Sequence, residues 1–83
     1  MAFLNPDTFN KTVKTILRFV KAAPNAVSEY EIVRLDLPLT KTALFYLKGN
    51  KYLVPSRGRR SYGKLFTNPA KAEVINASLE IQS

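Results

Sequence analysis

The sequence predicts a mainly α-helical fold of the α+β class, with three helices, a small β-hairpin and a C-terminal helix. Three patterns predict it. Apolar residues recur with a helical period in the first half of the chain; two short runs of strand formers flank a glycine-containing polar loop; a further helical pattern follows them. A chain of 83 residues can bury one modest core. We therefore expect a single domain over 1–83, with the core fold in 5–67 and the last helix within 68–81.

The first predicted helix begins at Asn5, a good N-cap, followed by Pro6 at the first helical position. Its apolar face is formed by Phe9, Val13, Ile16, Leu17 and Val20. Pro24 ends it. A second face carries Lys11, Lys14, Arg18 and Lys21. We interpret this basic stripe as a solvated face, with contact to phosphate as the alternative.

A capping box predicts the start of a short second helix. Ser28 is the cap and Glu31 lies three residues later, while Val27 and Ile32 have the spacing of a hydrophobic staple. The buried side of this helix is expected to consist of Ile32, Val33 and Leu35.

The third helix is expected to start near Leu39 or Thr40, and Thr40 is also a candidate cap. On a helical wheel the core side holds Ala43, Leu44 and Leu47, and the opposite side holds Lys41, Thr42, Phe45 and Tyr46. Gly49-Asn50 is a typical helix stop.

Two short strands and a last helix complete the prediction. Strand formers occupy 52–54, Pro55 ends or edges that strand, and 65–67 form the returning strand after the polar loop 56–63. Asn68-Pro69 repeats a cap-plus-proline start, and the helix runs from Ala70 to Leu79. The apolar residues of this C-terminal segment are Val74, Ile75, Leu79 and Ile81.

Positive charge is segregated along the chain. The net charge is +7, and no acidic residue occurs between Asp36 and Glu73. That window contains eight basic residues, namely Lys41, Lys48, Lys51, Arg57, Arg59, Arg60, Lys64 and Lys71. A one-sided field of this kind attracts polyanions. The alternative is that the charge only keeps a small domain soluble.

The composition excludes several chemistries. Without cysteine or histidine, the chain has no disulfide, no thiol nucleophile and no His-ligated zinc. Glu29 and Glu31 lie two residues apart on a helix and form no catalytic dyad, so we expect no enzyme activity, no metal and no cofactor. No apolar run approaches the roughly 18 residues that span a bilayer, and the N-terminus lacks signal-peptide features. We therefore expect a cytoplasmic protein without a membrane partner.

The order of elements resembles the winged helix-turn-helix superfamily of small DNA-binding domains. The resemblance covers about 5–67 and is clearest at Leu44-Phe45-Tyr46-Leu47 followed by Tyr52-Leu53-Val54. The usual glycine just before the strand is displaced, since Lys51 precedes the strand and Gly49 lies two residues earlier. This departure bears on the length of the third helix. The small size is similar to that of phage, plasmid or archaeal-virus regulators.

The resemblance implies that the third helix enters the major groove and that the basic loop is the wing. The helix would present Lys41, Thr42, Phe45 and Tyr46 to DNA, and the wing would place Arg57, Arg59 and Arg60 on phosphates or in the minor groove, flanked by Lys48, Lys51 and Lys64. The helix face lacks Arg, Asn and Gln, so strong direct readout is not expected. Alternatively, Phe45 and Tyr46 pack against the first helix or a partner subunit, and the loop arginines are merely solvated.

The resemblance thus implies double-stranded DNA binding by a transcriptional regulator. Reading two half-sites would require a homodimer, formed through the apolar C-terminal segment with help from Phe3, Leu4 and Phe19. The alternative is that the last helix packs on its own domain. The competing functional class is a protein- or RNA-interaction module on the same scaffold.

Overall fold

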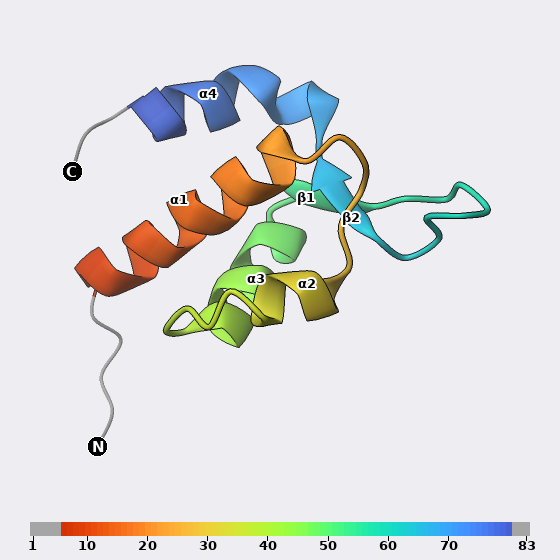
Figure 1. Cartoon of the computed structure of the whole chain (residues 1–83). Coiled ribbons are helices and arrows are strands. Elements are labelled where there is room, and N and C mark those ends of the chain that lie inside the picture. Colours follow the sequence, from red (N-terminus) through yellow and green to blue (C-terminus); the bar gives the residue numbers. More distant parts are fainter. Residues whose placement is uncertain (1–5, 81–83) are drawn as a thin grey trace.

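The computed structural model describes residues 6–80 and confirms the predicted class, mainly helical with one small antiparallel hairpin (Figure 1). In chain order the elements are α1 (Pro6–Ala22), α2 (Glu29–Val33), α3 (Thr40–Gly49), β1 (Leu53–Pro55), β2 (Leu65–Thr67), the 3-10 turn η1 (Pro69–Lys71) and α4 (Ala72–Glu80). The predicted cap Asn5, together with Phe3, Leu4 and Ile81, lies outside the described residues.

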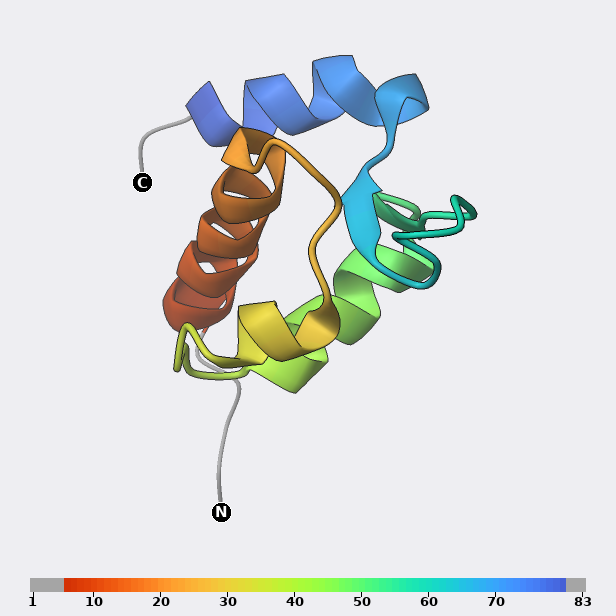
Figure 2. The ribbon, with the colours of Figure 1, turned by 45° about the vertical axis from the view of Figure 1, so that its right-hand side comes forward.

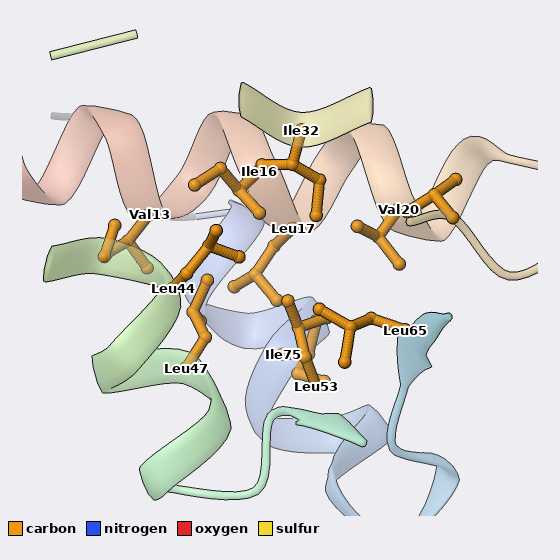
Figure 3. Packing of buried hydrophobic residues seen from close by; sticks show 12 residues of the cluster. Val13, Ile16, Leu17, Val20, Ile32, Leu44, Leu47, Leu53, Leu65 and Ile75 are labelled. Carbon is orange, nitrogen blue, oxygen red and sulfur yellow. The ribbon is translucent and has the colours of Figure 1, made fainter. Parts of the chain in front are cut away.

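The apolar stripe of α1 is the centre of the core. Ile16 is completely buried, and α1 packs against α3, β2 and α4 (Figure 3). The buried cluster comprises Val13, Ile16, Leu17, Val20, Val27, Ile32, Ala43, Leu44, Leu47, Leu53, Leu65 and Ile75. Because these residues come from every helix and both strands, each element is held by burial of its own apolar side chains.

The predicted capping box at the start of α2 is confirmed. The Ser28 hydroxyl accepts a hydrogen bond from the Glu31 amide at 3.2 Å, and the Glu31 carboxylate accepts one from the Ser28 amide at 2.9 Å. The predicted burial of Val33 is wrong, because its side chain is 45% exposed and only Ile32 of this helix is fully buried. A five-residue helix completes little more than one turn, so it presents a single residue to the core.

Left-handed residues flank α3 on both sides, and its N-terminus has no side-chain cap. The N-cap is Leu39 in the left-handed region, and Thr40 is already helical, so the prediction of Thr40 as the cap is wrong. The Thr40 hydroxyl instead donates to the Leu37 carbonyl at 2.6 Å. After the predicted stop at Gly49-Asn50, Lys51 takes a left-handed conformation with a φ of 65°. Lys51 therefore occupies a turn position that glycine would fill without strain.

The hairpin is joined to the segment before α2. Strands β1 and β2 are antiparallel, with Val54 opposite Phe66, and Leu65 also forms an isolated bridge with Val27. Two backbone hydrogen bonds make that bridge, one from the Val27 amide to the Leu65 carbonyl at 2.9 Å and one in the reverse direction at 2.6 Å. Both side chains are buried, so the hairpin cannot shift without exposing core residues.

The C-terminal segment packs on its own domain. Asn68 caps η1 as predicted, and the 3-10 turn precedes the α-helix that the sequence predicted from Ala70. Ile75 is buried and Leu79 is half-buried against the core, so both residues pack on their own domain, which is the alternative considered for this segment, and the homodimer stays a prediction. Val74 is 51% exposed.

Two basic residues of α1 hold α4 in place. The Arg18 guanidinium donates to the Leu79 carbonyl at 3.1 Å, and the Lys21 ammonium donates to the side-chain oxygen of Asn76. These members of the predicted basic stripe therefore have a structural use.

No helix within residues 6–80 is long and apolar enough to cross a membrane.

The left-handed turn after α3 generates a stability prediction. Replacing Lys51 with glycine removes a steric penalty of roughly 1–2 kcal/mol, which the greater chain entropy of unfolded glycine offsets in part. We expect Lys51→Gly to raise the free energy of unfolding by about 0.5–1 kcal/mol, measured by urea denaturation. Lys51→Ala is the control, because it removes the charge and keeps the Cβ atom. Equal stability of the two variants would contradict this account.

Docking of α4 generates a second prediction. Ile75→Ala removes a fully buried side chain and should lower the free energy of unfolding by about 2–4 kcal/mol. Val74→Ala, one position earlier on the same helix, should change it by less than about 0.5 kcal/mol because Val74 faces solvent. Thermal and urea denaturation of both variants would measure the difference. Similar destabilisation by the two substitutions would mean that α4 does not dock through Ile75.

Candidate nucleic-acid interface

The outer face of α3 carries the predicted residues on one continuous surface. Lys41, Thr42, Phe45, Tyr46 and Lys48 are all exposed, whereas Ala43, Leu44 and Leu47 on the inner face are buried, as predicted. The helical period alone accounts for this separation. A ten-residue helix is about 15 Å long, so the face is a short ridge that ends at Gly49.

The two adjacent aromatic residues of this face differ in their use. The Tyr46 ring makes an edge-to-face contact with Phe9 of α1, with centroids 5.4 Å apart, and lies 6.1 Å from the Tyr52 ring. Tyr46 therefore packs against the first helix, which is the structural alternative considered for both residues. Phe45 is 79% exposed and has no such ring contact among the described residues. Phe45 is thus the ring on this face that is available to a ligand.

An ion pair links α3 to the start of α2. The Lys48 ammonium lies 2.8 Å from the Glu29 carboxylate, and both side chains are about half exposed. An exposed pair of this kind contributes at most about 1 kcal/mol. Because no acidic residue occurs between Asp36 and Glu73, the sequence predicted that no acid neutralises Lys48. This prediction is wrong, because Glu29, which lies outside that window, pairs with it.

The basic loop, residues 56–64, is held by its own hydrogen bonds. The Ser56 and Ser61 hydroxyls lie 2.6 Å apart, and the Gly63 amide donates to the Ser56 carbonyl at 3.0 Å. Gly63 has a φ of 84°, so it is the glycine that the turn requires. Gly58 has no positive φ, and a Cβ atom there would lie 3.1 Å from the Ser61 hydroxyl. Close approach, rather than turn conformation, therefore limits this position.

Three arginines project from this ordered loop. Arg57, Arg59 and Arg60 are exposed, and within residues 6–80 their guanidinium groups form no hydrogen bond or ion pair. The loop extends away from the helices in both views of the ribbon (Figures 1 and 2). The loop therefore places three positive groups outside the body of the domain, and no acidic side chain within residues 6–80 pairs with them.

The remaining two predicted residues lie at different places around the hairpin. Lys51 follows α3 at the base of the hairpin, where its carbonyl accepts a hydrogen bond from the side-chain amide of Asn68 at 2.9 Å. Lys64 is half-buried and lines a shallow pocket of about 480 Å³ with Glu31 and the C-terminal end of α1. Lys64 thus shares this pocket with an acidic residue, and no residue of α3 lines it.

Other exposed aromatic residues accompany the basic groups. Tyr62, 79% exposed, extends from the basic loop, and Tyr30, 68% exposed, has the Arg34 guanidinium 5.7 Å from its ring centroid. Sequence reasoning did not select either tyrosine. The signal was present for Tyr62, because aromatic residues interspersed with arginines are typical of nucleic-acid surfaces, where rings stack on bases.

The hydroxyl pair in the basic loop generates a prediction. Ser61→Ala removes the Ser56–Ser61 contact and leaves every charge in place, at a cost of about 1 kcal/mol to local order. We expect amide exchange at Gly63 and Lys64 to accelerate about fivefold, measured by hydrogen exchange and NMR. The Leu65 amide, which bonds to Val27, is the internal control and should be unchanged. Unchanged exchange throughout the loop would contradict a role for the hydroxyl pair.

Comparisons with protein families, with curated proteins and with solved structures found no match for this chain. Within residues 6–80, no three acidic, histidine or cysteine side chains come together as a metal site requires. Two features distinguish the surface of residues 6–80: the exposed outer face of α3 and the three unpaired arginines of the basic loop.

Proposed function

We propose that this protein binds double-stranded DNA as a winged helix-turn-helix domain without catalytic activity. In this proposal α3 is the recognition helix in the major groove, and the basic loop is the wing, which contacts phosphates or the minor groove. The observation that carries the proposal is the set of three exposed, unpaired arginines in a loop that projects from the body of the domain.

The geometry of α3 supports the first half of the proposal. The major groove of B-form DNA is about 12 Å wide and admits one helix. An exposed helical face that has Lys41 at its start and no acidic residue of its own suits that groove. Lys48 is the weaker candidate for a phosphate contact, because Glu29 already neutralises it and DNA would have to compete for the ammonium group.

Internal order in the basic loop supports the second half. Hydrogen bonds of Ser56, Ser61 and Gly63 fix the backbone of the loop. The loop therefore loses less conformational entropy when its arginines bind a ligand, which lowers the free-energy cost of binding. Guanidinium groups bind phosphate oxygens in pairs of hydrogen bonds and also suit a narrow minor groove. Tyr62 adds an exposed ring beside them.

Regulation of transcription and assembly as a homodimer are part of the same proposal. One short helix reads only a few base pairs, so useful specificity would come from two copies on two half-sites. Of the C-terminal apolar side chains within the described range, Val74 is the one left substantially exposed for such a contact. RNA or protein binding by the same surface is the competing class, which the experiment below distinguishes.

The proposal predicts strong dependence of DNA affinity on salt. Binding of wild-type protein to a short duplex should weaken steeply between about 50 and 200 mM salt, because each phosphate contact releases counterions. Arg59→Ala combined with Arg60→Ala should weaken binding to all sequences, or to A·T-rich ones, and reduce the slope of log affinity against log salt by about two. Fluorescence anisotropy at four salt concentrations would measure both quantities.

The matched control is Lys11→Ala combined with Lys14→Ala on α1. It removes the same charge from the stripe whose alternative role was phosphate contact, and it should leave the salt slope nearly unchanged. An RNA duplex of equal length serves as competitor. Salt-independent DNA binding, wild-type behaviour of the arginine variant, or preference for the RNA duplex would each count against the proposal.

A further inference from the structure

The outer face of α3 contains an unusual set of side chains for reading bases. The side chains that recognise base edges by hydrogen bonds are mainly Arg, Lys, Asn and Gln. Of these, Asn and Gln bind a base through two hydrogen bonds from one side-chain amide group. The nearest amide, that of Asn50, is already used, because it donates to the Tyr46 carbonyl at 2.8 Å. Apart from its two lysines and two hydroxyl groups, this face offers apolar surface.

Phe45 is the most prominent part of that apolar surface. Its ring is 79% exposed, and its neighbours one turn away are Lys41 and Thr42 before it and Lys48 and Gly49 after it. A Cβ atom built on Gly49 would meet nothing within 4 Å, so the space beside the ring is open. An apolar groove of about 490 Å³ runs along it, lined also by Phe9 and Tyr46.

The major groove of DNA displays one apolar group, the C5-methyl group of thymine. Phenyl and threonine methyl groups are the side-chain surfaces that suit it. Lys41, exposed one turn before Phe45, supplies positive charge beside the apolar surface, which complements the phosphates that border the groove.

We propose that α3 reads thymine through its C5-methyl group, with Phe45 as the main contact and Thr42 as the second. This inference rests on the proposed binding of duplex DNA. Specificity then comes from burial of methyl groups against an apolar ridge. Each methyl group buried in this way contributes about a fourfold gain in affinity.

The test compares thymine with uracil, which differs only in lacking the methyl group. A duplex is first selected by wild-type protein from a random pool and its contacted segment is mapped by footprinting. Affinity is then measured for the selected duplex, for the same duplex with deoxyuridine throughout the contacted segment, and for a control with deoxyuridine only outside it. We expect about a fourfold loss for each contacted methyl group in the second duplex and no loss in the third.

Two variants assign the effect to residues. Phe45→Ala, at an exposed position that leaves the core intact, should bind the thymine and uracil duplexes with a much smaller difference. Lys41→Ala should weaken binding to both duplexes equally and keep their ratio. Circular dichroism confirms that both variants are folded, and the uracil comparison with wild-type protein needs no variant.

The outcomes separate this inference from the proposed function. Salt-dependent binding that is equal for thymine and uracil duplexes, or a selected site without thymine, would overturn methyl recognition and leave DNA binding intact. A Phe45→Ala variant that retains the full thymine preference would overturn the role of Phe45. Failure of the wild-type protein to bind any duplex would overturn the proposed function itself.

Discussion

The two backbone hydrogen bonds between Val27 and Leu65 are the constraint on which the rest of the structure depends. They join the segment before α2 to β2, across more than a third of the chain. Each bond contributes only about 1 kcal/mol, but both residues are buried, and burial of each side chain adds about 1.5–3 kcal/mol. The bridge thereby fixes the hairpin against α1 and determines where the basic loop leaves the body of the domain.

Backbone strain at both ends of α3 defines the length of its outer face. Leu39 before the helix and Lys51 after it both adopt left-handed conformations, which L-residues with a Cβ atom rarely occupy. The surrounding packing stabilises these turns, because Ala43, Leu44 and Leu47 are buried between them. The helix is consequently limited to one short ridge, with the exposed Phe45 near its middle.

The 13 lysines and arginines are not equally free to contact a ligand. Arg18 and Lys21 bind α4, Lys48 is paired with Glu29, and Lys71 lies 5.4 Å from the centroid of the Tyr52 ring. The unpaired arginines of the basic loop lie apart from these groups. Some of the basic side chains therefore hold elements of the fold together, whereas the three loop arginines have no partner within residues 6–80.

The sequence by itself determined features that depend on neighbouring residues. The capping box of α2, the stop after Gly49, the strand at 65–67 and the buried stripe of α1 all follow from local hydrogen bonding or from a helical period, and the structure confirms them. These signals act over a few residues, so one sequence is enough to read them.

Only the tertiary structure decided which of two similar neighbouring residues packs and which stays exposed, and which charged residues form an ion pair. Tyr46 packs on Phe9, whereas Phe45 stays exposed. Val33 is exposed although Ile32 beside it is buried. Lys48 forms an ion pair with Glu29. Each outcome depends on where a distant element lies, and the Val27–Leu65 bridge and the left-handed turns set those positions. Contacts between residues far apart in the chain leave no local pattern, because they arise from the joint burial of several elements around one core.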